Sequence, residues 1–330
     1  MKKVLVITYH YPPINNGATP RLSQFVKYLP QYGYIPTVLT TNKFGMTDDD
    51  KNILRVREYG VIEKSRILLI TYKIIRKILY RTGLVVDPLI IWRLQCIRFI
   101  DKLLLHEKFD LVFASFPPSV NIELAIYLKK KYNLPLVSDF RDGLVFEPLR
   151  KENVFRRLSD KYFEKKVVKN SDYIITVTPP ITKYFHLKYE NCKVDTITNG
   201  FQEYDYQENI LLNTDNVNIL YSGRISLSSA SQTINLFIDV LSGLISTNVF
   251  AKKIKFIVIG DLTKQEIDYL NKKLNSNFEY RGLVEHHQSI LFQKQANYLL
   301  FVASESRSSL ATTKIYEYRG LAFQSPNVQH

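Results

Sequence analysis

Short apolar runs alternate with amphipathic segments along most of this chain. Val4–Thr8 is a β-branched run bounded by turn residues, which is typical of a parallel strand buried on both faces. Residues 19–33 follow with apolar positions at helical spacing, a threonine cap and a terminal glycine, and residues 37–40 form the next apolar run. This order of strand, helix and strand predicts a βαβ unit, the building block of a doubly wound α/β sheet.

The same alternation predicts two successive α/β domains. In the first, further strands are expected at residues 111–115, 135–139, 173–177 and 194–198, and helices at 119–132 and 154–169. In the second, strands are expected at 217–221, 256–259, 278–280 and 299–302, and helices at 231–244, 265–274 and 289–296. Residues 202–216 are polar and aperiodic, so we interpret them as a linker between domains 1–201 and 217–330. Two such domains are expected to enclose a crevice between the carboxyl ends of their strands, where ligands bind in these folds.

Residues 61–108 interrupt the alternation of the first domain. Within them, residues 66–81 are apolar with recurrent cations and no acidic residue. One interpretation is a pair of helices that pack on the domain and leave a basic face in solvent. The other, which adds to the first, is an amphipathic surface that docks on anionic lipid through the cations Arg66, Lys73, Arg76, Lys77 and Arg81.

Composition narrows the class of partner. The 330 residues include 45 lysines and arginines against 31 acidic residues, and the resulting net charge of +14 predicts an anionic partner. Nucleic acid is not expected, because no nucleic-acid-binding motif is present and the aromatic residues fall largely within expected strands and helices. Cys96 and Cys192 are too few for a disulfide framework or a cysteine zinc cluster, which fits a reducing cytoplasm. No window approaches the ~18 apolar residues of a membrane-spanning helix.

Candidate site residues of the first domain lie at the expected carboxyl ends of strands. His10 follows the first strand, and Arg141 and Asp142 follow the strand that ends at Asp139. We interpret His10, Arg141 and Asp142 as catalytic candidates that face a bound substrate. A structural histidine, and an ion pair that holds the next loop, are the alternatives.

A second candidate feature is the loop at residues 12–18, which precedes the first expected helix. Backbone N–H groups and the helix dipole can face an anion there, and Gly17 belongs to this loop. Arg21 lies in the first helical turn, where a cation is unfavourable for the dipole, and this favours its use on a ligand. The loop matches no phosphate-binding motif, so a simple turn is the alternative. The acidic run at residues 48–50 lies in a polar loop beside a lysine and is interpreted as solvated, so no metal is expected.

Several short motifs follow one another in a specific order over essentially the whole chain. They are Tyr9–Pro13 with Gly17 and Arg21, Asp87-Pro88 with Trp92, Ser115–Ser119, Asp139–Asp142, Thr198–Phe201, Ser222–Arg224, Gly282 and Lys314–Tyr318. Together they resemble glycosyltransferase family 4, which has the GT-B fold of two Rossmann-like domains, and in particular the branch that serves bacterial surface polysaccharides. The resemblance implies transfer of a sugar, with retention, from a nucleotide diphosphate sugar to a membrane-associated, lipid-linked or saccharide acceptor. It also implies a cytoplasmic enzyme that is peripheral on the inner face of the plasma membrane.

The resemblance assigns a diphosphate site to the second domain. Without a metal or cofactor, a departing diphosphate must be stabilised by fixed cations and backbone dipoles. Arg224 follows the first expected strand of this domain and resembles the phosphate-binding arginine of the family, although a surface arginine in a turn is the alternative. Ser229 stands where the family usually has a lysine, and Lys314 is the candidate that replaces it.

Glu317 resembles the glutamate of the family that binds ribose, because a carboxylate can accept two hydrogen bonds from a cis-diol. Ser309 stands where the family has another glutamate, and Ser309 and Thr312 are the donor-sugar candidates. The family pattern breaks after residue 318, so we expect the second domain to be shortened and incomplete. A non-catalytic or truncated nucleotide-binding member of the family is therefore the alternative to an active enzyme.

Overall fold

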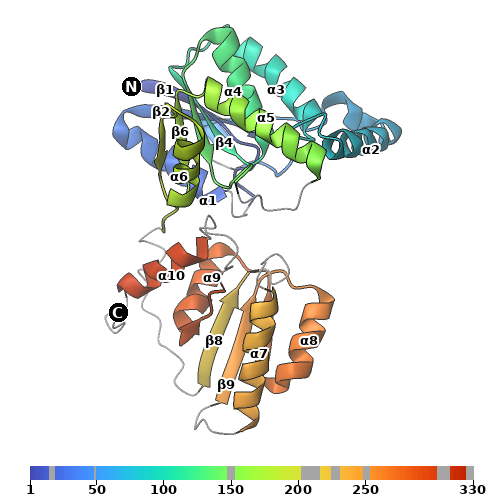
Figure 1. Ribbon diagram of the computed structural model, residues 1–330, viewed down its shortest axis with the longest axis vertical. Helices are drawn as coiled ribbons and strands as arrows, with labels where there is room; N and C mark the ends of the chain where they lie inside the picture. Colours follow the sequence, from blue (N-terminus) through green and yellow to red (C-terminus); the bar gives the residue numbers. More distant parts are fainter. Residues whose placement is uncertain are drawn as a thin grey trace. The chain divides into compact units, whose positions relative to one another are not determined.

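The computed structural model divides the chain into two compact units, Met1–Thr198 and a second unit that begins at Asn199 (Figure 1). The expected linker at residues 202–216 lies outside the described residues, apart from Asn216. The structure describes residues 1–14, 19–47, 50–146, 153–201, 216–223, 231–247, 253–302 and 313–324.

A parallel sheet of seven strands forms the centre of the first unit. Its strand order is β3-β2-β1-β4-β5-β6-β7, and every neighbouring pair is parallel. The strands are β1 (Lys2–Ile7), β2 (Tyr34–Thr41), β3 (Ile53–Val56), β4 (Leu111–Phe116), β5 (Leu136–Phe140), β6 (Tyr173–Thr176) and β7 (Val194–Thr196). The helices are α1 (Thr19–Tyr28), α2 (Arg66–Arg81), α3 (Ile90–Leu103), α4 (Ser119–Tyr132), α5 (Val154–Asn170) and α6 (Pro179–Lys188).

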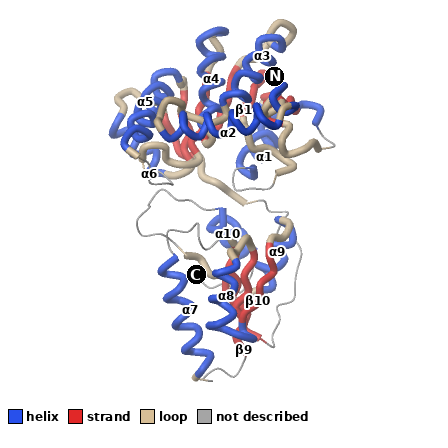
Figure 2. The backbone as a smooth tube through the Cα atoms, turned by 90° about the vertical axis from the view of Figure 1, so that its right-hand side faces the viewer, coloured by secondary structure: helices blue, strands red, loops and turns tan. Residues whose placement is uncertain are grey.

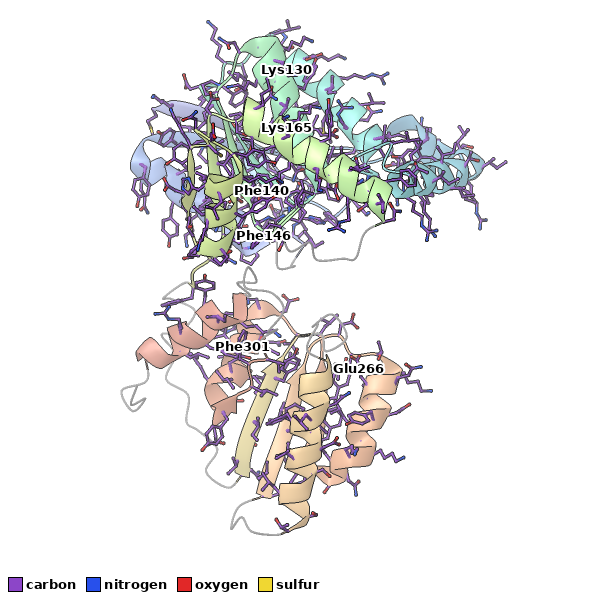
Figure 3. The ribbon with its side chains drawn as sticks, in the orientation of Figure 1. Lys130, Phe140, Phe146, Lys165, Glu266 and Phe301 are labelled. Atoms are coloured by element: carbon purple, nitrogen blue, oxygen red, sulfur yellow. The ribbon has the colours of Figure 1, made fainter. Side chains whose placement is uncertain are left out.

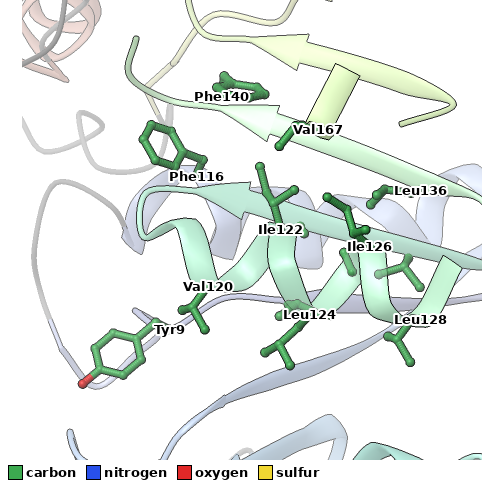
Figure 4. Packing of buried hydrophobic residues seen from close by; sticks show 14 of the residues in the cluster. Tyr9, Phe116, Val120, Ile122, Leu124, Ile126, Leu128, Leu136, Phe140 and Val167 are labelled. Carbon is green, nitrogen blue, oxygen red and sulfur yellow. The ribbon is translucent and has the colours of Figure 1, made fainter. Parts of the chain in front are cut away.

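Alternate residues of β1 pack into separate cores, as expected of a strand that is buried on both faces. Leu5 and Ile7 belong to the larger core, which includes residues of α3, α4 and α5. Val4 and Val6 belong to a smaller core with Leu22 of α1. Figure 4 shows the larger core around α4, whose apolar side chains lie against β4, β5 and α5. The first unit is therefore a doubly wound sheet with helices on both faces.

The second unit repeats this plan on a smaller scale. Its four parallel strands have the order β10-β9-β8-β11. They are β8 (Asn216–Ser222), β9 (Lys253–Ile259), β10 (Phe278–Gly282) and β11 (Tyr298–Leu299), and the helices are α7 (Ser231–Ser246), α8 (Lys264–Leu274), α9 (His286–Gln295) and α10 (Thr313–Gln324). Figure 2 shows α7 and α9 on opposite sides of this sheet. Its core joins apolar residues of α7 and α8 to Phe256 and Val258 of β9.

The predicted α/β class with a doubly wound parallel sheet in each half is confirmed. Two elements of the first unit were not predicted, β3 and α6. Two elements of the second unit also differ from expectation, because α9 begins at His286 and β11 covers Tyr298–Leu299. The expected shortening of the second domain stays a prediction. No described helix is long and apolar enough to cross a membrane.

Candidate functional site

The carboxyl edge of the first sheet gathers polar and aromatic residues. The chain continues from β1 into Tyr9 and His10, from β2 toward Phe44, and from β5 into Arg141 and Asp142. The His10 ring stacks on Phe44 with 5.7 Å between ring centroids and meets Tyr9 edge-on at 5.0 Å. Parallel strands end at the same edge of a sheet, and this explains why residues far apart in sequence meet here.

His10 is held in its neutral form. Its Nδ1 atom is buried and has no hydrogen-bond partner among the residues that the structure describes. Burial, followed by the nearby cations Arg141 and Lys43, lowers the pKa of His10 to about 4. The imidazole is therefore neutral near pH 7 and has an unused ring nitrogen available to a ligand hydroxyl.

Arg141 also keeps a buried polar atom without a described partner, and Asp142 directly follows it. The Arg141 backbone N–H donates to the Phe116 carbonyl at 3.0 Å, and its guanidinium donates to the Pro117 carbonyl, but its Nε atom is buried without a described partner. Burial raises the pKa of Asp142, and the neighbouring Arg141 opposes this shift. Arg141 and Asp142 form no ion pair in the described structure, so both can face a bound ligand.

Asp139 and Arg21 have a structural role instead. Asp139 is fully buried and accepts hydrogen bonds from Arg21 Nη2 at 2.8 Å and from Ser115 Oγ at 2.7 Å. Arg21 Nη1 also donates to the Ile197 carbonyl at 2.6 Å. Arg21 thus ties α1 to β5 and to the end of β7, and these contacts give it a structural role. The partner of Asp139 is Arg21 rather than the adjacent Arg141.

Sequence reasoning missed an acidic group at the same edge of the first sheet. Glu58 follows β3, and its side chain is only 4% exposed. The Lys43 ammonium lies 3.0 Å from Glu58 Oε2 and 3.4 Å from the Tyr9 hydroxyl. Burial, and then the Glu58 charge, raise the pKa of Tyr9. The signal in the sequence was the short segment Ile53–Val56 that forms β3, which is apolar apart from Arg55 and was not predicted. We call Tyr9, Lys43 and Glu58 the Glu58 cluster.

The carboxyl edge of the second sheet is formed by glycine backbone. Gly223 ends β8 with a φ of 131°, and Gly260 ends β9 with a φ of 136°, a region that favours glycine. The Gly223 N–H donates to the Ile259 carbonyl at 2.7 Å. A Cβ atom on Gly260 would overlap the backbone of Gly223, and a Cβ on Gly223 would overlap the Lys314 ammonium. The glycines therefore allow Lys314 to lie directly on the strand ends.

Lys314 is a half-buried cation in the first turn of α10. Its ammonium lies 4.3 Å from the centroid of the Tyr221 ring, and no described residue forms a hydrogen bond or ion pair with it. Burial lowers the pKa of Lys314 to about 8, and the charge of Glu317 partly opposes this shift. Glu317 itself accepts a hydrogen bond from Gln293 Nε2 at 3.1 Å. An anion bound at the end of β8 would give Lys314 the counter-charge that it lacks.

The other predicted site residues fall into two groups. Gly17, Arg224, Ser309 and Thr312 lie outside the described residues, as do Asp48 and Asp49. The five predicted membrane cations all lie on α2, where Arg76 packs over the Tyr72 ring at 5.9 Å and Lys73 lies 6.0 Å from the Tyr59 ring. In the part of the chain that the structure describes, no group of three or more His, Cys, Asp or Glu side chains could hold a metal ion.

Solved structures with the same architecture cover nearly the whole chain. Sucrose-phosphate synthase from Thermosynechococcus elongatus matches with a TM-score of 0.64 and 13% identity, over 91% of this chain and 75% of that one. Anabaena HepE, solved with UDP-glucose, matches with a TM-score of 0.60 and 11% identity, over 97% and 79% of the two chains. TarM, an S. aureus protein, matches with a TM-score of 0.60 and 13% identity, over 91% and 80%. At these identities the likeness shows the fold, which is GT-B.

Sequence comparison identifies the family. No significant match was found among curated proteins. The profile of Glycosyltransferase Family 4 matches residues 15–203, which is more than half of the chain and includes Arg141, Asp142 and the Glu58 cluster apart from Tyr9. The chain therefore belongs to glycosyltransferase family 4.

Proposed function

We propose that the protein transfers a sugar, with retention, from a nucleotide diphosphate sugar to a lipid-linked or other saccharide acceptor. The observation that carries this proposal is the Lys314 ammonium, which lies without a described counter-ion on the glycine-lined end of β8. A departing diphosphate gains negative charge as the bond to the sugar breaks, and a fixed cation in a poorly solvated site stabilises that charge strongly. Arg224, which follows Gly223, is proposed as the second cation.

Glu317 supports the nucleotide half of this proposal. It lies one helical turn after Lys314, and its carboxylate accepts a hydrogen bond from Gln293, which orients it while leaving capacity for ribose hydroxyls. The structure of HepE contains UDP-glucose, and one TarM structure contains UDP. A UDP-sugar is therefore the first donor to test. The nucleotide sugar is a substrate, and we propose that the reaction needs no metal or other cofactor.

The acceptor half is assigned to the first unit. The neutral His10 imidazole and the Asp142 carboxylate can accept hydrogen bonds from sugar hydroxyls, and Arg141 can pair with an acceptor phosphate. Glu58 and Lys43 offer a further acceptor and donor at the same edge. Because transfer is proposed to retain configuration, no side chain is assigned as a nucleophile. These residues would position the attacking hydroxyl and exclude water.

The acceptor is proposed to be membrane-associated, as part of polysaccharide synthesis, with the enzyme peripheral on the inner face of the plasma membrane. The support for this is the basic, apolar character of α2, which carries Arg66, Lys73, Arg76, Lys77 and Arg81 and no acidic residue. Cations on an amphipathic helix are attracted to anionic headgroups.

Isothermal titration with UDP-, GDP- and CMP-linked sugars tests the donor half. We expect one nucleotide class to bind, and Lys314→Met to weaken its binding by about 1.5–3 kcal/mol, the range for a hydrogen bond to a charged group. Lys272→Met, on the exposed side of α8, is the matched control and should leave affinity unchanged. Equal affinity of the Lys314→Met and Lys272→Met variants would remove Lys314 from the donor site.

Product formation from the bound donor and a lipid-diphosphate saccharide tests turnover. Nucleotide binding without product, across a panel of acceptors, would favour the non-catalytic alternative. Salt-sensitive RNA or DNA binding without any nucleotide-sugar binding would contradict the proposal.

A further inference from the structure

Helix α2 exposes a continuous stripe of isoleucines to solvent. Ile67, Ile70, Ile74 and Ile78 follow one another at intervals of three and four residues, so they share one face of the helix. Their exposed fractions lie between 50 and 77%, and no residue of α2 is fully buried. Monomeric soluble proteins rarely leave such a contiguous apolar surface uncovered, and where they do it marks an interaction site. We call these four residues the isoleucine stripe.

The opposite side of α2 is fixed to the first unit. The Tyr72 hydroxyl donates to the Pro88 carbonyl at 3.0 Å and accepts from the Ile91 N–H at 3.3 Å. The Tyr72 ring also packs against Tyr59, with 6.1 Å between the centroids. Tyr72 lies on the face away from the stripe, so these contacts hold the isoleucines outward.

The N-terminal half of α5 also exposes apolar residues. Val154, Phe155, Leu158 and Tyr162 have exposed fractions between 58 and 72%. The start of α5 is joined to the end of α2, because Asn153 Nδ2 donates to the Arg81 carbonyl at 2.9 Å. The two helix ends lie side by side in Figures 1 and 2. We call the isoleucine stripe together with these four residues of α5 the α2–α5 face.

The exposed charges on helices α2 and α5 themselves all have one sign. Helix α2 contains no acidic residue, and the two acids of α5, Asp160 and Glu164, are buried and paired with Arg156 and Lys188. The exposed cations of the two helices include Lys165, which is labelled in Figure 3. They are Arg66, Lys73, Lys77, Arg81, Arg157, Lys161, Lys165 and Lys169. On α2, Arg66, Lys73 and Lys77 recur at intervals of seven and four residues and so form a basic edge beside the stripe.

We infer that the α2–α5 face is the surface through which the protein docks on an anionic lipid bilayer. The isoleucines and Phe155 would enter the boundary between headgroups and acyl chains, while the flanking cations pair with lipid phosphates. A second copy of the chain is a poorer fit, because a symmetric contact would bring two sets of cations together without an exposed acidic residue on either helix. An anionic bilayer fits better, because its headgroups supply the negative charge that the cations lack and its acyl chains supply an apolar layer for the isoleucines.

This inference deepens the proposed function and names the surface on which its membrane-associated acceptor rests. Tyr59, which supports Tyr72 of α2, directly follows Glu58. The docking helix is therefore packed against the segment that carries part of the candidate acceptor site. Docking through α2 would bring the Glu58 cluster near the lipid that carries the acceptor.

Co-sedimentation with vesicles tests the inference on the full chain. We expect binding to vesicles of phosphatidylcholine with phosphatidylglycerol and little binding to phosphatidylcholine alone. The variant Ile74→Gln/Ile78→Gln should bind at least about tenfold more weakly, because two apolar side chains no longer enter the bilayer. Lys77→Gln/Arg66→Gln should lose roughly 20-fold, since each cation near an anionic membrane contributes about fivefold. Leu236→Gln/Val240→Gln is the matched control, because α7 also exposes these apolar residues but contains no cation.

Three results would overturn the inference. The first is absence of binding to the anionic vesicles, and the second is equal loss of binding in the α7 control and the α2 variants. The third is a dimer in sedimentation velocity that Ile74→Gln/Ile78→Gln dissociates, which would make the face a protein interface. Nucleotide-sugar titration of the same variants keeps the two proposals distinguishable. Unchanged donor affinity with lost vesicle binding in the α2 variants supports both proposals. Vesicle binding by the unmodified protein without any nucleotide-sugar binding contradicts only the proposed function.

Discussion

At the scale of single residues, the ionisable groups of the first unit fall into two classes. Arg21 and Asp139 satisfy each other within the unit, with further hydrogen bonds to Ile197 and Ser115. His10 and Arg141 keep buried nitrogen atoms for which the described structure offers no partner. A buried polar atom without a partner is costly, so a ligand that supplies the missing hydrogen bonds is the physical reason to keep such atoms.

The Arg21–Asp139 pair allows a test of the structural assignment. Arg21→Ala should lower the free energy of unfolding by about 3–5 kcal/mol, because it leaves the Asp139 carboxylate buried without its counter-charge. Trp92 is the single tryptophan and is fully buried in the first unit, so its fluorescence during urea unfolding reports this unit. The double variant Arg21→Met/Asp139→Asn should recover part of the loss. If Arg21→Ala left stability unchanged but removed acceptor binding, Arg21 would be a ligand residue after all.

His10 makes the stability of the first unit depend on pH in a defined direction. Its pKa is about 4 in the folded protein against 6.5 for a free histidine, so between these values the unfolded chain binds a proton that the folded chain does not. The contribution of the neutral His10 to the free energy of unfolding is therefore fully present above pH 6.5, and it is lost as the pH drops toward 4. We expect His10→Gln to reduce the difference in the free energy of unfolding between pH 7 and pH 5 by roughly 1–2 kcal/mol. This range includes a reduction because solvent partly screens the imidazole. Urea unfolding at pH 7 and pH 5, in both proteins, measures the difference, and parallel losses would contradict it.

Lys314 should make donor binding depend on pH in the opposite way. Its pKa is about 8 in the free protein, so the ammonium loses its proton as the pH rises through that value, and affinity for a diphosphate should fall with it. Binding near pH 8 should take up a fraction of a proton, because the bound diphosphate stabilises the charged lysine. Titration calorimetry in buffers with different ionisation enthalpies measures this uptake. Lys314→Arg should bind without it, and uptake that persists in this variant would assign the proton to another group.

At the scale of elements, the carboxyl ends of β8 and β9 depend on two glycines for different reasons. Gly260→Ala forces the backbone of Gly223 to move, whereas Gly223→Ala displaces the flexible end of Lys314. Both residues have left-handed φ angles, so each substitution is expected to destabilise the second unit by at least about 1 kcal/mol. We expect Gly260→Ala to cause the greater loss of stability in thermal unfolding. Gly223→Ala should lose more donor affinity than its stability loss explains, and equal effects of the two variants on both measurements would contradict this division.

Several of the correctly predicted elements have a clear apolar pattern in the sequence. Strand β1 contains a continuous buried apolar run, and the apolar residues of α1 and α8 recur at the helix period. Strand β3 has four residues and includes Arg55, so its periodicity is too short to separate it from a loop. Missing β3 also concealed Glu58, because the carboxyl end of an unrecognised strand cannot be examined for site residues.

Site residues could be predicted from the sequence where their position at the end of a strand identifies them. They could not be predicted where their role depends on which residue lies beside them in the folded chain. His10, Arg141 and Asp142 follow β1 and β5, and strand ends can be located from the sequence. The helix dipole favoured a ligand for Arg21, and only the folded chain shows that Asp139 lies within hydrogen-bonding distance of it. Lys314 and the end of β8 are also distant in sequence, and their proximity depends on glycines that permit close packing.

At the scale of the whole molecule, the net charge of +14 and the exposed α2–α5 face lead to one joint prediction. If the first unit docks on an anionic bilayer, a lipid-linked acceptor in that bilayer is concentrated near the enzyme, whereas a water-soluble acceptor is not. Turnover of the lipid-linked acceptor should rise by roughly tenfold or more when phosphatidylglycerol is added to the vesicles, as effective concentration predicts. High salt should reverse this gain, because screening weakens the attraction between cations and headgroups.

The isoleucine variant separates this explanation from a direct effect of lipid on catalysis. Ile74→Gln/Ile78→Gln should lose most of the vesicle-dependent gain in turnover and keep its rate with a water-soluble acceptor, since the substitutions lie on a face that contacts no described site residue. A fall in both rates would mean that α2 supports the catalytic site through its Tyr72–Tyr59 contact rather than through lipid. Equal activation of the variant and the unmodified protein would mean that the acceptor, and not the α2–α5 face, carries the enzyme to the membrane.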